Sequence, residues 1–395
     1  MTGRKTRMKI IGILFAGLLL LYGCGSPSSH LAEVTEITDA AESAGEKETD
    51  TAEGLVYEGS MELQYAQNFA IDYYKGGYKL LTITDGTEIL VVPEGKEIPK
   101  GLDEETIVMR QPVENLYLVA SAVMDMFDAL DAVDAVRFSG QQEDGWYVEA
   151  ARNAMRAGEM IYAGKYNKPD YEMLVAEGAS LAIENMMISH SPEVVEMLRD
   201  FGIEVMIEYS SYESHPLGRV EWIKFFGALV GKEEEAERAF KEQAAILDRV
   251  AADEKTDKTV AFFFITSNGL VQVRRSSDYV PKMIELAGGS YVPGNLGDEE
   301  SNRSTMNMQI EEFYDRAKEV DYIIYNSSID GGIASIEELL DKCAVLEDFK
   351  AVKEGRVWCT TNDMYQQSMS IGYLIEDIHA MLQGEEDMRY LFRLR

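Results

Sequence analysis

Short apolar runs alternate with helix-length amphipathic segments along most of this chain, and this alternation constrains the fold more than any other feature. Buried strands of parallel sheets read as continuous apolar runs, and helices usually connect them. The sequence therefore predicts an α/β protein built from βαβ units, with mostly parallel sheets. The strands expected in these units are 116–120, 135–138, 181–183, 205–207, 259–265, 270–273, 322–325 and 357–359. Three earlier strands are expected at 68–74, 78–83 and 88–93, the first two joined by a Gly-Gly hairpin turn.

A long amphipathic segment divides these strands into two series. Apolar residues recur at helical spacing across 231–252, which predicts one long helix. We therefore expect two Rossmann-like lobes joined by a rigid backbone helix. Their expected bounds are 55–230 for the first lobe, 231–257 for the linker and 258–395 for the second lobe. Ligands of open α/β sheets bind beyond the carboxyl ends of the strands, so the cleft between the lobes is the expected binding site.

The N-terminus predicts the compartment. Residues 1–9 carry four basic side chains and no acidic one, and an apolar run of 13 residues follows, ending at Tyr22. A bilayer span needs about 20 apolar residues, so this pattern favours a signal peptide, with an uncleaved anchor as the alternative. Gly23-Cys24 follows this run directly, and the junction Leu21-Tyr22-Gly23-Cys24 resembles a bacterial lipobox. That resemblance implies removal of residues 1–23, lipidation of Cys24 and an extracytoplasmic, membrane-anchored protein. Residues 24–54 are acidic and lack apolar periodicity, which predicts a disordered tether.

Charge and composition exclude several classes of function. The chain has 37 Lys and Arg against 70 Asp and Glu, so its net charge of −33 argues against a nucleic-acid partner. Three cysteines exclude a four-cysteine zinc site. Cys343 and Cys359 are either disulfide partners or separate thiols. The sequence contains no G-x-S-x-G, P-loop or H-E-x-x-H motif. We therefore expect a binding protein, not an enzyme, with no resident cofactor.

The order of lipobox, tether, lobe, helix and lobe resembles the substrate-binding lipoproteins of bacterial ABC importers. Within them it is similar to the group with a single helical backbone (class III), which captures ferric siderophores, haem or cobalamin. Local motifs similar to those of this group occur in both lobes, in the same order. They are Lys-Pro-Asp-Tyr-Glu-Met-Leu at 168–174 with 179–183, then 198–205, 283–289, 310–313 with 320–324, and 350–357.

The resemblance implies a set of partners. A membrane permease and its ATPase would receive the small-molecule chelate from a monomeric receptor. In this group, one glutamate near the start of equivalent helices in each lobe docks on permease arginines; the matching positions are Glu172 and either Glu311 or Glu312. Exposed carboxylates steer association and fix register. The alternative is that these acids only complement the helix dipole.

Candidate ligand-binding residues follow predicted strands or adjoin the expected cleft. An adjacent arginine pair in so acidic a chain suggests an anionic ligand, because guanidinium forks suit carboxylates; the alternative is a surface pair bridging Asp278. A histidine after strand 205–207 suits iron or an anion, although such residues are often ordinary hydrogen-bonded loop residues. Aromatic side chains suit a large planar ligand, with packing onto the lobe as the alternative. The candidates are Arg274, Arg275, Tyr279, Trp146, Tyr212, His215, Asp363 and Tyr365, whereas Met186 and Met187 are expected to fill the core.

Two other functions stay open at this point. The same scaffold could serve a surface lipoprotein that senses or adheres, without a transporter. A receptor for Zn²⁺ or Mn²⁺ is less favoured, because such sites need several histidines and carboxylates to converge and the chain has four histidines in all. The sequence does not select one chelate among the three candidate classes.

Overall fold

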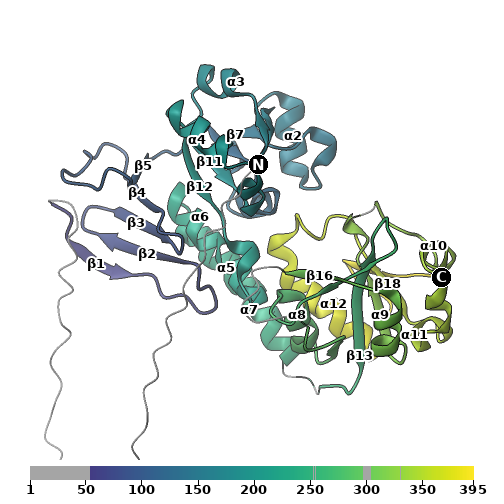
Figure 1. The fold of residues 1–395 in the computed structure, drawn as a ribbon. Coiled ribbons are helices and arrows are strands. Elements are labelled where there is room, and N and C mark those ends of the chain that lie inside the picture. The colour runs from purple at the N-terminus through teal and green to yellow at the C-terminus, as the bar shows by residue number, and fades with distance from the viewer. Residues whose placement is uncertain (1–53, 252, 254, 297–303, 330) are drawn as a thin grey trace, which may run out of the picture. The chain divides into compact units, whose positions relative to one another are not determined.

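The computed structural model describes residues 54–251, 253, 255–296, 304–329 and 331–395 (Figure 1). The predicted signal peptide, Cys24 and the predicted tether up to residue 53 lie outside these residues. Within the described part, none of the helices has the length and apolarity required to cross a membrane.

The chain first forms a five-stranded sheet without helices. Its strands lie side by side in chain order: β1 (Tyr57–Ser60), β2 (Phe69–Tyr74), β3 (Tyr78–Ile83), β4 (Glu88–Val92) and β5 (Ile107–Arg110). Neighbours from β1 to β4 are antiparallel, whereas β4 and β5 are parallel. Alternate side chains such as Ile71, Leu81 and Ile89 are fully buried and face the core, as the period of two along a strand requires.

The second sheet is wholly parallel. Its order is β12 (Glu204–Ile207), β11 (Leu181–Glu184), β6 (Leu116–Leu118), β7 (Val136–Ser139) and β8 (Ile161–Tyr162). The helices between these strands are α1 (Met124–Ala129), α2 (Glu149–Ala157), α3 (Tyr171–Ala176) and α4 (Pro192–Asp200), and a short ribbon of β9 (Gly164–Lys165) and β10 (Lys168–Pro169) precedes α3. This is the predicted Rossmann-like arrangement of the first lobe.

The structure thus places two sheets within the predicted lobe 55–230. The region from β1 to β5 contains no helix and no βαβ crossover, so it is not part of the Rossmann-like unit. Its attachment to the rest of the lobe uses buried carboxylates. Glu221 accepts hydrogen bonds from the backbone N–H groups of residues 64–66, and Glu213 accepts those of residues 67 and 68.

Three consecutive helices lead from the first lobe to the second. They are α5 (Pro216–Glu221), α6 (Ile223–Val230) and α7 (Glu233–Ala251). Gly231 ends α6 in a left-handed conformation (φ 78°) that favours glycine, so the long helix begins just after it. The helix predicted over 231–252 corresponds to α7, and α5 and α6 are additional buried helices before it.

The second lobe contains a seven-stranded mixed sheet. Its main order is β16 (Thr305–Met308), β14 (Val271–Arg274), β13 (Thr259–Ile265), β17 (Tyr322–Tyr325), β18 (Val357–Thr360) and β19 (Leu391–Arg393), and β15 (Ser290–Val292) also pairs with β13. Strands β15, β13, β17 and β18 are parallel, whereas β14, β16 and β19 are antiparallel to their neighbours. The helices are α8 (Tyr279–Leu286), α9 (Ile310–Ala317), α10 (Ile336–Lys342), α11 (Lys350–Lys353) and α12 (Ile371–Gln383).

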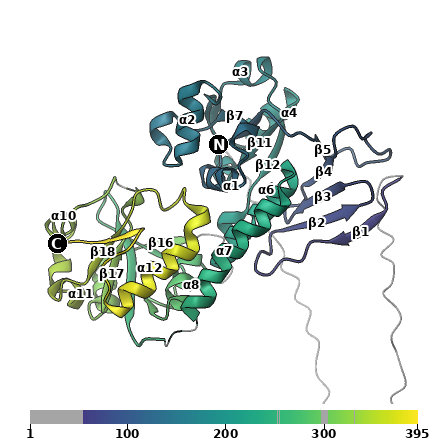
Figure 2. The ribbon, with the colours of Figure 1, turned by 180° about the vertical axis from the view of Figure 1, so that it is seen from behind.

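One apolar core extends through both lobes. Helix α12 lies alongside α7 (Figure 2), and buried residues of α5, α6, α7, α8 and α12 belong to the same cluster as those of the first two sheets. Two smaller clusters cover the opposite faces of the lobe sheets. Cys343 and Cys359 are not joined by a disulfide.

Candidate functional site

A cavity of about 350 Å³ lies at the carboxyl ends of β6, β11 and β12, where open α/β sheets bind ligands. The first lobe supplies most of its wall, α5 supplies Arg219, and the loop after β18 in the second lobe supplies Tyr365. The cavity therefore occupies the predicted position between the lobes. Its lining residues are Ala120, Ser121, Ala122, Asn185, Met186, Met187, Ser189, His190, Glu208, Ser211, Tyr212, Arg219 and Tyr365.

Arg219 is the most unusual side chain of this cavity. It is only 7% exposed, and its Nε has no hydrogen-bond partner in the described part of the chain. Its guanidinium lies 4.1 Å from the centroid of the Tyr279 ring, a cation–π contact. No carboxylate among the described residues forms an ion pair with it. The Glu208 and Asp278 carboxyls interact with its charge only from beyond ion-pair distance, so the guanidinium can still bind an anionic group from outside the chain.

Arg219 was not among the residues predicted from the sequence. Helix α5 is buried along its whole length, and Arg219 is one of only two charged residues in it. The sequence feature that could have identified Arg219 is a positive charge within a short apolar segment that follows Pro216. Its charge distinguishes it from the core residues around it.

Glu208 lies in the same cavity, just beyond the carboxyl end of β12. It is 2% exposed, and its Oε2 accepts hydrogen bonds from the Ser210 N–H at 2.8 Å and the Ser210 hydroxyl at 2.5 Å. Burial raises the pKa of this carboxyl, while Ser210 and the more distant charge of Arg219 act in the opposite direction. The cavity thus contains the buried carboxyl of Glu208 and the buried guanidinium of Arg219, which do not form an ion pair with each other.

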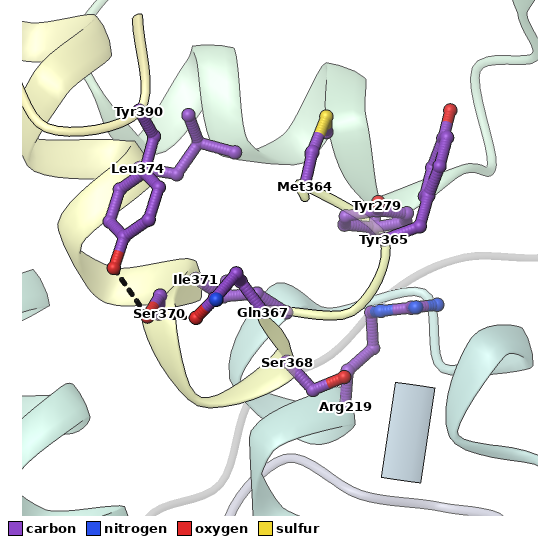
Figure 3. Close-up of a pocket in the computed structure, with 10 residues that line it drawn as sticks. All are labelled: Arg219, Tyr279, Met364, Tyr365, Gln367, Ser368, Ser370, Ile371, Leu374 and Tyr390. Atoms are coloured by element: carbon purple, nitrogen blue, oxygen red, sulfur yellow. Dashed lines mark hydrogen bonds between the residues drawn. The ribbon is translucent and has the colours of Figure 1, made fainter. Parts of the chain in front are cut away.

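A small neighbouring pocket shares Arg219 with this cavity (Figure 3). Its volume is about 20 Å³, enough for one water molecule. Tyr279 and Tyr365 line it on one side, and Tyr390 donates to Ser370 at 2.7 Å on the other. Burial raises the pKa of Tyr279 to about 12, which keeps this ring neutral beside the guanidinium. The uncharged Tyr279 ring therefore packs against the Arg219 guanidinium.

Arg274 is engaged with residues of its own lobe. Its Nη1 lies 3.4 Å from Asp278 Oδ2, and its Nη2 donates to the Tyr365 hydroxyl. Asn326 also donates to that hydroxyl, at 2.7 Å. The Tyr365 oxygen thus accepts two hydrogen bonds, and its own proton is left to donate elsewhere. Arg274 fixes the orientation of a cavity residue.

Arg274 and Arg275 were expected at the cleft because they follow a strand, but this strand runs in the opposite direction to the parallel strands of the sheet. Strand β14 runs antiparallel to β13, so its carboxyl end points away from the carboxyl ends of β13, β17 and β18. Arg274 reaches Tyr365 only through its long side chain. Arg275 is half-buried, donates from Nε to the Thr305 carbonyl at 3.4 Å, and is not among the residues that line the cavity.

The segment just after Tyr365 is hydrogen-bonded to the first lobe at three residues. Gln366 accepts from the Tyr147 N–H and donates to the Gly145 carbonyl, both at 2.8 Å. Ser368 donates to the Ala122 carbonyl at 2.6 Å. The Met369 N–H donates to Asp125 at 2.7 Å, and burial raises the pKa of Asp125 to about 6. These bonds set the distance between the two walls of the cavity.

The structure places the other predicted ligand residues as follows. Tyr212 lines the cavity and is 43% exposed. Trp146 lies in the core, 1% exposed, and donates to Ser139 at 3.0 Å, which corresponds to the packing alternative. His215 lies outside the lining residues and caps α5, where its Nδ1 accepts from the Leu217 N–H at 3.1 Å. Asp363 is half-buried outside the cavity, with Oδ1 unpartnered among the described residues.

Met186 and Met187 line the cavity, whereas they were expected to fill the core, and Met187 is 49% exposed. They belong to a short 3₁₀ segment that directly follows β11. His190, at the end of the same segment, also lines the cavity. Sequence periodicity does not distinguish such a segment from buried structure, because it is too short to show a period. The described residues contain no cluster of His, Cys, Asp or Glu suited to a metal ion.

The predicted docking glutamates lie on helices of different lobes. Glu172 is in the first turn of α3, and Glu311 and Glu312 are in the first turn of α9. All three are exposed, and none lines the cavity. Glu312 forms an ion pair with Arg316 at 2.9 Å, one helical turn later.

The comparisons with known proteins agree with this architecture. No protein-family model matches the chain. It is 24% identical over 353 residues to an uncharacterised lipoprotein of Methanocaldococcus jannaschii, with 82% of each chain covered.

Among solved structures, the haem-binding protein HutB of Vibrio cholerae has a TM-score of 0.55 at 15% identity, covering 68% of this chain and 98% of that one. A protein of an ABC-type Fe³⁺-hydroxamate transport system from Saccharomonospora viridis has a TM-score of 0.52 at 16% identity, covering 69% and 93%. The chain therefore has the two-lobed α/β fold of the ABC-importer substrate-binding proteins, as its sequence motifs predict.

Proposed function

We propose that this chain is a lipid-anchored extracytoplasmic substrate-binding protein of an ABC importer, which captures a metal chelate and delivers it to a permease. The candidate ligands are a ferric siderophore, haem or cobalamin. The observation that carries the proposal is Arg219, a buried cation in the cavity that forms no ion pair with any of the described residues.

The charge of the whole chain makes this arginine more informative. With a net charge of −33, the protein repels anions in general. Although the chain is rich in carboxylates, none of those in the described residues forms an ion pair with Arg219. The guanidinium is therefore available to an anionic ligand. A carboxylate or phenolate oxygen of a chelate would accept its hydrogen bonds, and in a shielded cavity such charge-assisted bonds are strong.

Aromatic and thioether side chains complete the proposed binding surface. Tyr212, Met186 and Met187 provide adaptable apolar contact from the first lobe. Tyr365 faces them from the second lobe as a hydrogen-bond donor. Arg274 and Tyr279 act behind this surface, because they hold Tyr365 and Arg219 in place.

Delivery to the permease is assigned to the exposed glutamates. Glu172 presents a carboxylate on α3, and Glu311 or Glu312 presents the equivalent one on α9. Glu311 is the better candidate of the two, because the Glu312 carboxylate is already paired with Arg316. Arginines on the extracytoplasmic loops of a permease would complement both lobes.

A thermal-unfolding screen with ferric siderophores, haemin and cyanocobalamin tests ligand capture. At a ligand concentration 100-fold above Kd, binding should stabilise the protein by about 2.7 kcal/mol. Replacing Arg219 by Met should remove most of that gain for an anionic ligand. Arg249→Met is the matched control, because Arg249 is exposed on α7 and pairs with Glu376. No stabilisation by any of these ligands would contradict the proposal.

A transport assay separates import from the alternative of a sensing or adhesion lipoprotein. Uptake of the captured chelate by cells that carry the cognate permease and ATPase should require this protein. Ligand binding without any effect on uptake would favour sensing.

A further inference from the structure

Two neighbouring helices of the first lobe, α3 and α4, carry exposed apolar side chains next to each other (Figure 1). Tyr171 and Val175 lie one turn apart on α3, and Met197 and Phe201 lie one turn apart at the end of α4. The rings of Tyr171 and Phe201 meet between the two helices, with their centroids 5.6 Å apart. These four side chains form one surface, which we call the apolar patch.

The apolar patch is open to solvent. Val175, Met197 and Phe201 are 47%, 41% and 48% exposed, and Tyr171 is half-buried. Both helices attach to the sheet through other apolar residues that are fully or almost fully buried, so the core does not require these four. Single exposed apolar residues are common on proteins, whereas a contiguous exposed group marks an interaction surface.

Three exposed carboxylates border the apolar patch. They are Glu172 on α3 and Glu193 and Asp200 on α4, and each lies within one helical turn of a patch residue. None of them forms an ion pair with another described residue. A surface of this kind fits a partner that presents an apolar side chain flanked by Lys or Arg. A second copy of this chain fits poorly, because it carries the same carboxylates and a net charge of −33.

The corresponding face of the second lobe is different. Helix α9 carries Glu311, but its Tyr314 packs against the Phe349 ring and beneath Lys318, whose Nζ lies 5.0 Å from the Tyr314 centroid. The exposed large apolar side chains described in that lobe are Ile329, Val345 and Phe392. None of these three lies on α9, so the apolar patch has no counterpart there among the described residues.

We infer that the apolar patch is the centre of the surface with which the first lobe docks on the permease, and that the second lobe docks through carboxylates alone. This inference rests on the proposed function and names the chemistry of its partner surface: an extracytoplasmic permease loop with an apolar side chain between basic ones. Because the two docking faces are unlike, the protein fits its permease better in one orientation than in the reverse one. Burial of the apolar patch supplies affinity that salt does not screen.

Binding of the full chain to nanodiscs that hold the cognate permease and ATPase tests the inference, with empty nanodiscs as the reference. Phe201→Gln should weaken docking about 30-fold or more, as expected for an aromatic residue at the centre of an interface. Val175→Thr keeps the shape of the side chain but adds a hydroxyl, so a loss of about three- to tenfold is expected. Phe392→Gln is the matched control, since Phe392 is 39% exposed on β19 of the other lobe, and it should dock like the unmodified protein.

The salt dependence separates the apolar patch from the glutamate beside it. Raising salt from about 0.1 M to about 1 M shortens the screening length from about 10 Å to about 3 Å. The loss caused by Glu172→Gln should therefore shrink at the higher salt concentration, whereas the loss caused by Phe201→Gln should persist. Equal urea midpoints for the variants and the unmodified protein exclude damage to the fold.

Each other outcome overturns the inference. Docking that Glu172→Gln weakens but that Phe201→Gln and Val175→Thr leave within threefold would do so and leave the proposed function standing. Binding to empty nanodiscs that Phe201→Gln abolishes would assign the apolar patch to the membrane. Self-association in analytical ultracentrifugation that Phe201→Gln abolishes would assign it to a second copy of the chain. If the unmodified protein does not dock at all, delivery to the permease falls, and the inference with it.

Discussion

Glu184 provides a quantitative test of the packing of the first lobe. It is the last residue of β11, is fully buried, and neither of its carboxylate oxygens has a hydrogen-bond partner among the described residues. Burial raises the pKa of this carboxyl from 4.5 to about 8. Burial raises the pKa values of Tyr117 and Tyr171, and the charge of Glu184 adds to both shifts.

The sign of the resulting pH dependence follows from proton binding. Between pH 4.5 and about 8 the folded protein holds a proton on Glu184 that the unfolded chain releases, so this group makes stability fall as pH rises through that window. Each tenfold change in proton affinity is worth about 1.4 kcal/mol. A rise from 4.5 to about 8 therefore sets an upper limit of about 5 kcal/mol on the loss.

Glu184→Gln removes this titration while keeping the shape of the side chain. We expect the variant to match the unmodified protein at pH 5 and to exceed its unfolding free energy by several kcal/mol at pH 9. Urea denaturation of both proteins at the two pH values measures the difference. Parallel pH profiles would refute the reasoning, because they would mean that Glu184 is solvated or paired in the folded state.

Two further predictions concern other carboxylates. Glu221→Ala leaves three backbone N–H groups without their acceptor and removes one of the two carboxylates paired with the buried Lys224, so urea denaturation should show a loss of about 3–5 kcal/mol, against little change for the exposed Glu234→Ala. Replacing Glu172, Glu311 and Glu312 together by Ala should leave chelate affinity within about threefold but reduce uptake by cells strongly. A tenfold loss of affinity, about 1.4 kcal/mol, would instead place these residues at the ligand.

The secondary structure of the lobes was largely readable from the sequence. The run 259–265 matches β13 residue for residue, and the predicted helix 231–252 contains α7. These elements are governed by local periodicity, which the sequence displays directly. Pairing partners are not local, and the parallel addition of β5 to β4 gave no sequence signal because residues 93–106 between them form no helix.

The candidate site was predicted less well, for a physical reason. Its position at the carboxyl ends of the strands follows from the fold class, but the residues that matter there depend on side-chain burial and pairing. Arg219 is notable because it forms no ion pair within the described part of the chain, which only the structure reveals. Conversely, Arg274 looked available in the sequence, yet Asp278 and Tyr365 already engage it. Trp146 was expected near the ligand, but it lies in the core, where its indole N–H donates to Ser139.

Amide hydrogen exchange with and without the tightest-binding chelate tests the central claim, capture of a ligand between the two lobes. The account predicts slower exchange on both walls of the cavity at once, in 120–123, 185–190 and 208–212 of the first lobe and in 363–367 of the second, while the sheet from β1 to β5 is unchanged. Slowing confined to one lobe, or centred on β1 to β5, would contradict it.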